Sequence, residues 1–312
     1  MVNKSLQRKI ATSRYALPLT SIYALGVCAY ALMEHQLWIQ TACLALASFM
    51  MVQLNNAYAL IRIYSRMVSC SFLVLCTMAA FLLPSLEGSL LQLCIIAFFL
   101  FFFRGYQDNR ATGWVFYAFA MWGIASIFFV QILYFVPILW VILYTNILAG
   151  SVKTLCASLL GLSVPYWFLA GYDVWMDNPT ELILHFQQLA LFQPIGQIQQ
   201  LPFNQLLTCG FLIILAMTGT IHFFRHSYND KIRTRMFYEV FVVIDAAAFI
   251  FIFLQPQHYS ELLRISIITT APLIGHFLAL TRTRITNIAF CMMLVIALTL
   301  TAINLWVPSL SF

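Results

Sequence analysis

The chain has 312 residues, of which 62% are hydrophobic and 8% are charged, and its formal net charge is +6. Soluble domains average about half apolar and about a quarter charged residues, so this chain has too few polar groups to cover a surface in water. We expect one all-α integral-membrane domain over residues 1–312. The basic residues flank hydrophobic segments and form no folded basic surface, which argues against nucleic-acid binding.

Motifs for metal or cofactor chemistry are missing from the sequence. All eight cysteines lie in apolar segments, and none forms a C-x-x-C pair. We therefore expect buried thiols, not disulfides or metal ligands. No Walker loop, dinucleotide fingerprint, H-E-x-x-H or G-x-S-x-G motif occurs, so we predict neither a cofactor nor a metal.

Apolar segments near the length of about 20 residues that crosses a bilayer recur along the chain. The first follows a basic stretch that resembles the start of a signal peptide. It is long enough to span and has no small-residue cleavage site, so we expect an uncleaved helix. The expected spans, about eleven in all, are 15–33, 37–57, 67–83, 89–103, two within 113–150, 154–171, 205–224, 237–254, 262–280 and 286–307.

The segment 113–150 is apolar throughout. As one helix it would be about 55 Å long, nearly twice the hydrocarbon thickness of a bilayer. We expect two crossings with a turn near 129–134, which contains the polar Gln131. The flanking basic residues Arg110 and Lys153 also require an even number of crossings.

This span count places fifteen of the sixteen Lys and Arg residues on one side of the membrane. Because basic residues concentrate in cytoplasmic loops, we expect a cytoplasmic N-terminus and a periplasmic C-terminus. The exception is Arg264, near the outer start of the span 262–280.

The connection 172–204 contains Asp173, Asp177 and Glu181 but no basic residue, so we expect it in the periplasm. Its N-P-T-E sequence is typical of a helix start. Apolar and polar residues then occupy opposite faces. We predict an interfacial amphipathic helix over 179–192, followed by an irregular Gln-rich segment.

A first candidate site lies in the same connection, where Asp173, Asp177, Glu181 and His185 repeat every fourth residue. On a continuous helix these side chains would form one row, able to perform acid–base catalysis or to bind a divalent cation. The alternative is a set of solvated loop and capping residues, with Pro179 interrupting the helix.

A second set of candidates, for substrate binding, lies within or beside the spans. Asp245 and His276 are ionisable groups inside spans, and such groups are costly in a membrane. We expect them to meet, either as a proton relay or substrate contact or as a structural pair. Arg264, beside His258 and Glu261, suits a phosphate because its planar group can bind two oxygens. Alternatively, it pairs with Glu261 or with an acidic residue of the connection 172–204.

Four segments, QLNNAYALIRIYSR, GIASIFFVQILYFVPILWVILY, LLGLSVPYWFLAGY and TTAPLIGHFLALTRTR, resemble a family of uncharacterised multi-span inner-membrane proteins of Bacteroides-type bacteria. The resemblance covers Asn55 to about Asn287 and implies a bacterial inner membrane. The span count and long outer loop are also similar to integral-membrane glycosyltransferases and O-antigen polymerases. However, the first outer loop has only Glu34 and His35 in place of an acidic pair, and the outer arginines are too few for a typical polymerase.

These features favour an inner-membrane protein of envelope biogenesis that acts on a lipid-linked or polyprenyl-linked substrate at the outer face. The first alternative is a transporter or flippase that uses Asp245 and His276. The second is a non-catalytic subunit that positions other proteins. The expected partners are the bilayer and a lipid-linked substrate; the sequence sets no oligomeric state.

Overall fold

The computed structural model describes residues 6–35, 37–176, 180–192 and 201–310. Within these ranges the chain forms thirteen α-helices and no strand, which confirms the all-α prediction. The α-helices are α1 (Leu6–Ala11), α2 (Ala16–His35), α3 (Trp38–Tyr58), α4 (Met67–Met78), α5 (Leu86–Phe102), α6 (Thr112–Phe128), α7 (Val136–Thr145), α8 (Val152–Trp175), α9 (Thr180–Gln187), α10 (Phe203–His226), α11 (Ile232–Leu254), α12 (Tyr259–Leu280) and α13 (Arg284–Leu310). Short 3-10 helices are η1 (Ala80–Leu82), η2 (Phe103–Gly105), η3 (Val130–Phe135), η4 (Gln188–Ala190), η6 (Ser227–Asn229) and η7 (Pro256–His258).

Long apolar helices dominate the part of the chain that the structure describes. Seven are long and apolar enough to cross a membrane, and four shorter apolar helical segments accompany them. Large apolar side chains such as Trp167, Phe168 and Ile288 are exposed on the outside. Such surfaces suit lipid rather than water.

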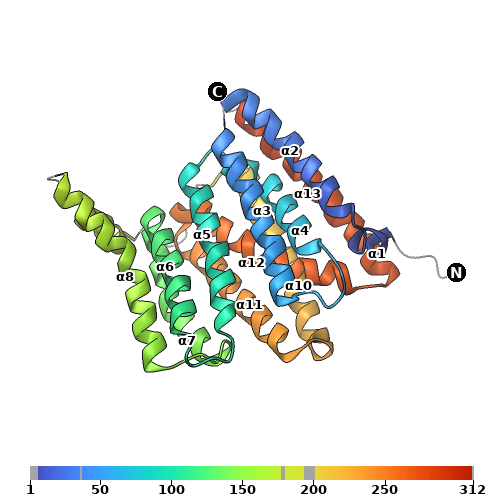
Figure 1. The fold of residues 1–312 in the computed structure, drawn as a ribbon. Helices are drawn as coiled ribbons and strands as arrows, with labels where there is room; N and C mark the ends of the chain where they lie inside the picture. The colour runs from blue at the N-terminus through green and yellow to red at the C-terminus, as the bar shows by residue number, and fades with distance from the viewer. Residues whose placement is uncertain (1–5, 36, 177–179, 193–200, 311–312) are drawn as a thin grey trace.

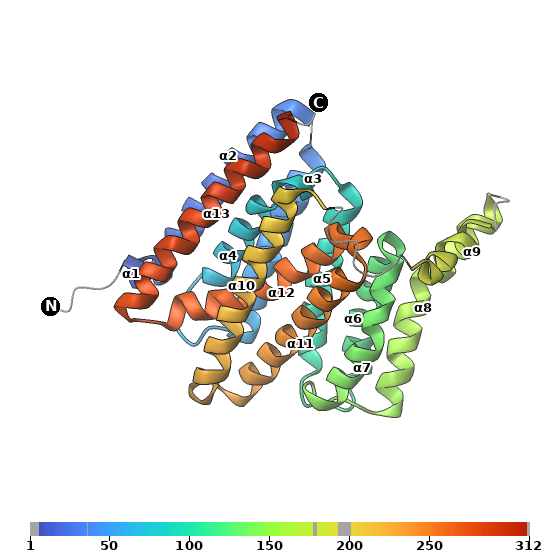
Figure 2. The same cartoon turned by 180° about the vertical axis from the view of Figure 1, so that it is seen from behind.

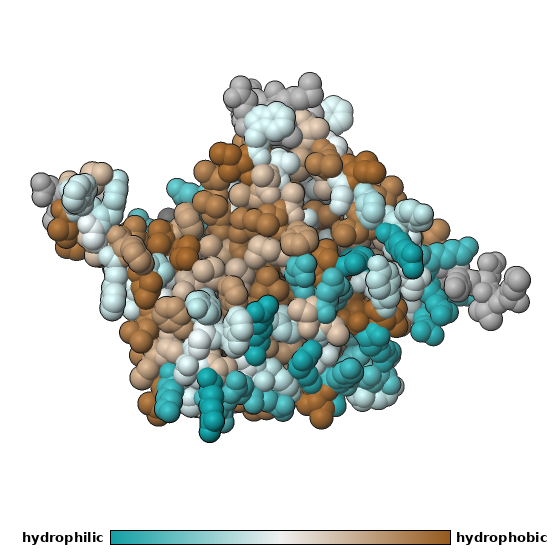
Figure 3. Space-filling view, viewed as in Figure 1, coloured by the Kyte–Doolittle hydropathy of each residue, from teal (hydrophilic) through white to brown (hydrophobic). Residues whose placement is uncertain are grey.

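The connections between helices gather at two ends of the bundle. At one end Arg62 Nη1 donates to the carbonyl of Asn229 (3.2 Å), and the backbone N–H of Gln107 donates to the carbonyl of Ile147 (2.8 Å). Hydrophilic residues crowd this end, along the lower edge of Figure 3. We call it the basic end, because it holds the lysines and arginines of the α3–α4, α5–α6 and α10–α11 connections.

The opposite end, called here the far end, joins the other connections. Gln40 Nε2 donates to the carbonyl of Pro84 (3.2 Å), and Tyr259 Oη donates to the carbonyl of Gln205 (2.7 Å). Gln131 Nε2 donates to the carbonyl of Gln188 (3.3 Å), which brings η3 against η4. The connections at the basic end and those at the far end therefore lie at opposite ends of the helical bundle.

Helix α12 forms the centre of the fold, and the opposite views in Figures 1 and 2 both place it inside the bundle. It packs against α4, α5, α10 and α11. All fifteen residues from 262 to 276 are buried. Two glycines permit close approach: a Cβ at Gly219 of α10 would overlap Leu273 of α12, and one at Gly275 would press on Val68 of α4. Small residues at such crossings are typical of packed membrane helices.

Two peripheral units flank this centre at opposite edges (Figure 1). Helices α2 and α13 run together, and the Tyr23 Oη donates to Thr301 Oγ1 across them (2.9 Å). Helix α8 packs against α6 at the other edge, where Gly123 and Gly161 leave room for the partner backbone. The basic N-terminal stretch adds the short helix α1, which the sequence pattern did not predict; Gln7 Nε2 fixes it to the Leu278 carbonyl (2.9 Å).

The segment 113–150 folds back on itself as expected, with η3 at the turn between α6 and α7. The long connection differs from the prediction, because α8 extends to Trp175 and makes Asp173 a helical residue. The helix predicted over 179–192 is shorter: α9 covers Thr180–Gln187, and η4 follows. Residues 177–179 and 193–200 lie outside the described residues.

Candidate functional site

Helix α12 brings three groups of polar side chains into the apolar core. Arg264 lies near the far end, Thr269 and Thr270 lie in the middle, and His276 lies toward the basic end. All four are buried. Polar groups inside a membrane bundle need hydrogen-bond partners, so their partners indicate what each group can do.

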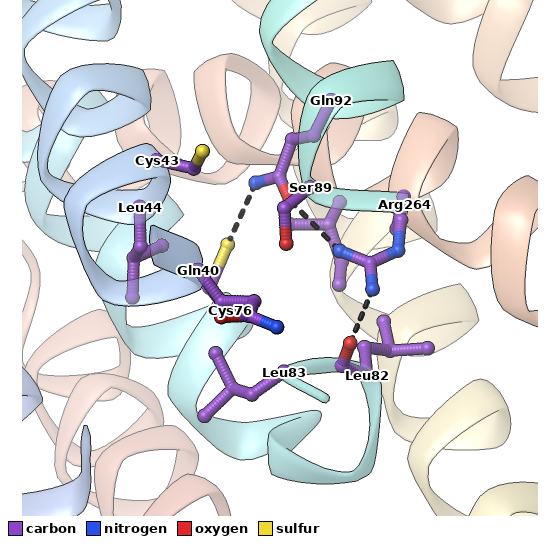
Figure 4. A pocket seen from close by; sticks show the side chains of 10 residues that line it. Gln40, Cys43, Leu44, Cys76, Leu82, Leu83, Ser89, Gln92 and Arg264 are labelled. Carbon is purple, nitrogen blue, oxygen red and sulfur yellow. Dashed lines mark hydrogen bonds between the residues drawn. The ribbon is translucent and has the colours of Figure 1, made fainter. Parts of the chain in front are cut away.

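Arg264 is only 4% exposed, and its guanidinium has neutral partners (Figure 4). Nη1 donates to Gln92 Oε1 of α5 (3.3 Å), and Nη2 donates to the carbonyl of Leu82 in η1. The Nε group has no hydrogen-bond partner. Gly88 creates the space for this arrangement, because a Cβ there would overlap the guanidinium.

A small cavity of about 20 Å³ lies beside the guanidinium. Its lining residues are Gln40, Cys43, Leu44, Cys76, Leu82, Leu83, Ser89, Gln92, Arg264 and Ile267. Gln92 links the two sides, because its Nε2 donates to Cys76 Sγ (3.2 Å) while its Oε1 accepts from Arg264. One water needs roughly 10–15 Å³, so the cavity admits one small polar group, such as a single oxygen of a larger anion.

No carboxylate among the described residues lies within 4.0 Å of the Arg264 guanidinium. The alternative of a direct ion pair with Glu261 is therefore wrong, and so is a direct pair with Asp173. The other acidic residues of the connection 172–204, Asp177 and the side chain of Glu181, lie outside the described residues. His258, which we grouped with Arg264, does not line the cavity: its ring packs against Phe129, with 5.3 Å between ring centroids. Glu261, one turn earlier on α12, acts on the guanidinium only at longer range. A buried positive charge whose direct partners are neutral favours the binding of an anion.

Asp245 of α11 is 3% exposed and accepts hydrogen bonds from α12. Thr269 Oγ1 lies 2.7 Å from Asp245 Oδ1, and Thr270 Oγ1 lies 3.1 Å from the same oxygen. Within the described ranges no basic side chain lies within 4.0 Å of this carboxyl group. The pair of threonines is therefore the only hydrogen-bonding environment that the structure gives Asp245 there.

The predicted contact between Asp245 and His276 is wrong. His276 Nε2 lies 3.0 Å from Asp230 Oδ2, and His276 Nδ1 lies 3.4 Å from His222 Nδ1. Asp230 Oδ1 is in turn 3.8 Å from Arg62 Nη1. Depth along two helices does not determine which side chains meet: the His276 ring faces His222 of α10 and packs against Tyr238 of α11, with 4.9 Å between the latter two ring centroids.

The sequence interpretation missed His222 and Asp230. Asp230 lies in a segment crowded with basic residues, which indicates the side of the membrane and does not single out the aspartate. His222 stands within the span 205–224, four residues before His226. The two rings stack with 4.5 Å between centroids. The spacing of four residues, which places both histidines on one face of a helix, was the signal in the sequence that could have identified His222.

The acidic row does not lie on one continuous helix, because α8 ends at Trp175 and α9 begins at Thr180. Asp173 is buried in α8. His185 of α9 packs near Tyr166 and has Nε2 3.1 Å from the carbonyl of Ser126. Asp177 and the side chain of Glu181 lie outside the described residues. No group of three or more metal-ligating side chains occurs in the part of the chain that is described.

The fold and these buried polar groups define the class of the protein: it is a helical membrane protein whose central helix carries buried polar side chains. The chain matches no known family profile, no curated protein and no solved structure.

Proposed function

We propose that the protein crosses a bacterial inner membrane eleven times, with the basic end in the cytoplasm and the far end facing the periplasm. Seven long and four shorter apolar helical segments supply the crossings. Fifteen of the sixteen basic residues belong to the expected cytoplasmic side, as the charge bias of membrane proteins requires.

Within this arrangement, Arg264 binds the phosphate of a lipid-linked or polyprenyl-linked substrate that enters from the outer leaflet. The observation that supports this function is a buried guanidinium beside a cavity, with no carboxylate of the described residues in direct contact. An arginine has five N–H groups, and only two donate in the structure. The remaining donors, with Ser89 and Gln40 beside them, suit a phosphate oxygen, and the protein belongs to envelope biogenesis on this proposal.

Binding of farnesyl phosphate to the purified protein in nanodiscs tests this function. Arg264→Gln removes the charge but keeps a side chain that can hydrogen-bond to Gln92. Hydrogen bonds to charged groups contribute about 1.5–3 kcal/mol, and about 1.4 kcal/mol corresponds to tenfold in affinity, so we expect a loss of tenfold or more. Native mass spectrometry measures the bound fraction.

Arg282→Gln, which changes an exposed arginine near the basic end, is the matched control and should bind normally. Farnesol, which lacks the phosphate, should bind weakly to the unmodified protein, and inorganic phosphate tests whether the isoprenoid chain is needed. Equal binding of farnesol and farnesyl phosphate, or full binding by the Arg264→Gln variant, would contradict the proposal.

A second candidate function is a proton-coupled transporter or flippase, favoured by the buried Asp245 and its two threonine donors. A carboxyl group without a basic partner in a bundle is suited to gaining and losing a proton. We expect Asp245→Asn to abolish proton uptake into liposomes driven by a membrane potential, as measured with a pH-sensitive dye. Glu239→Gln on the same helix, where Glu239 accepts from Asn146 (2.7 Å), is the control; equal uptake by all three proteins would remove this candidate.

A further inference from the structure

A second, much larger cavity lies between the α1–α2–α13 unit and the central helices α4, α10 and α12. Its volume is about 260 Å³, far above the roughly 10–15 Å³ that one water needs. Its lining is almost entirely apolar and includes Leu19, Leu75, Leu215, Met293 and Ala297. An apolar cavity of this size does not hold ordered water, and an empty one loses the packing energy of its lining.

One polar group in the lining has no partner. Ser71 of α4 is 7% exposed, and its hydroxyl makes no hydrogen bond. By contrast, the hydroxyl of Thr20, also in the lining, lies 3.1 Å from the carbonyl of Ala16. Ser71 is four residues into α4, about 6 Å from its start at the basic end. A buried unpaired hydroxyl favours a ligand with a hydrogen-bond acceptor at that depth.

Two arginines are sequence neighbours of residues that line the cavity at the basic end, and one of them, Arg66, donates from Nη1 to Asn56 Oδ1 (3.2 Å). Arg14 stands between the lining residues Ser13 and Tyr15, and Arg66 directly precedes the lining residue Met67. No aspartate or glutamate occurs in residues 6–33 or 62–83. Basic groups beside an apolar site at the cytoplasmic surface attract anionic lipid headgroups.

We propose that this cavity binds one acyl chain of an anionic phospholipid from the leaflet at the basic end. The chain fills the apolar space, an ester carbonyl accepts a hydrogen bond from Ser71, and the phosphate lies beside Arg14 and Arg66. The phospholipid thereby joins the α2–α13 unit to the central bundle. The site is at the opposite end from Arg264, and it does not depend on the anion site there.

Native mass spectrometry of protein released from nanodiscs that contain equal amounts of phosphatidylglycerol and phosphatidylcholine tests the proposal. The unmodified protein should retain one phosphatidylglycerol. Ala297→Phe fills the cavity from α13 and should reduce the retained fraction at least fivefold. Ala302→Phe, on an exposed position of the same helix, should retain the lipid.

The preference for the anionic headgroup is tested in the same experiment. The double variant Arg14→Gln with Arg66→Gln should reduce the preference for phosphatidylglycerol, whereas Lys153→Gln should not.

Full retention by the Ala297→Phe variant, or equal retention of the two lipids by the unmodified protein, would overturn the proposal. A second experiment needs no substitution, so it remains decisive if Ala297→Phe prevents folding. Phosphatidylglycerol with a diazirine in one acyl chain should crosslink to Leu75, Leu215 or Met293. Crosslinks confined to exposed positions of α2 and α13 would show that lipid only surrounds the protein and would exclude the site.

Discussion

The surroundings of Arg264 are unusual for a buried arginine. Its partners are an amide and a backbone carbonyl, and its Nε donates to nothing. Burial of a charge without a direct ion pair is costly, so we expect an anion that binds beside the guanidinium to stabilise the folded protein.

Adding one methyl group at Gly88 tests whether the space beside this glycine holds the Arg264 guanidinium in place. We expect Gly88→Ala to displace the guanidinium, because the new Cβ would overlap its Nε and Cζ atoms. Overpacking of this kind costs about 1–3 kcal/mol, and binding of farnesyl phosphate should weaken with it. Thermal unfolding in detergent and native mass spectrometry measure the two effects.

Gly26→Ala in α2 is the control, because no atom lies within 4 Å of the added Cβ. This change should leave stability unchanged or raise it by about 0.5–1 kcal/mol, the usual gain over glycine inside a helix. If both alanine variants behave alike, contact with Gly88 does not hold Arg264 in place.

Among the residues, the sequence identified Arg264 as exceptional because it alone departs from the charge asymmetry. It did not identify Gln92 or the Leu82 carbonyl, which lie 172 and 182 residues away along the chain. Amides and carbonyls in apolar segments have no distinctive local pattern, so only the packing of α5, η1 and α12 reveals them.

At the scale of the elements, α12 is connected to α10 through two facing imidazoles. His276 Nδ1 and His222 Nδ1 are 3.4 Å apart, and such a contact needs one N–H and one lone pair. Because the carboxylate of Asp230 accepts from His276 Nε2, a neutral His276 presents a lone pair at Nδ1 and His222 must supply the proton. The helices are thus joined by a chain of three side chains.

We expect His222→Gln to destabilise the protein by about 1–3 kcal/mol, the cost of leaving a buried polar group without its partner. Arg225→Gln, at an exposed position of the same helix, should cost less than about 0.5 kcal/mol, the usual limit for surface changes. Thermal unfolding in detergent compares the two. Equal shifts would mean that the imidazole contact does not join the helices.

Helix boundaries near α8 and α9 illustrate what periodicity can and cannot predict. The fourfold spacing from Asp173 to His185 fits one helix, yet α8 ends at Trp175 and α9 begins at Thr180. The proline at position 179 is compatible with a helix start but not with a helix interior. Local chemistry therefore predicted the start of α9 correctly, while the longer periodic pattern did not describe one element.

At the scale of the whole molecule, the composition was enough to predict an all-helical membrane protein. The length of about 20 residues that a membrane-spanning helix needs then located the helices. The sequence could not predict α1. This helix has only six residues, three of its first four side chains are polar or basic, and so it shows no apolar periodicity. The central position of α12 was also beyond the sequence, since all spans are apolar and burial depends on their arrangement.

The proposed topology predicts where reporters inserted into the chain will be found. A reporter after Asn109 or Asn229, in connections at the basic end, should be cytoplasmic. A reporter between residues 187 and 200 should be periplasmic, because the connection has no basic residue. Alkaline phosphatase, active only outside the cytoplasm, and green fluorescent protein, fluorescent inside, report the side. A cytoplasmic location for the insertion at 187–200 would invert the topology and remove the outer-leaflet site.

The enclosure of α12 bears on how the chain is made. Helix α12 packs against α1, α4, α5, α10 and α11. All five helices precede α12 in the chain, so the ribosome synthesises them earlier. A segment with a buried arginine and histidine enters lipid reluctantly on its own. The helices that enclose α12 are therefore available when it is inserted, and we expect contact with them to assist an insertion that the buried polar side chains of α12 oppose.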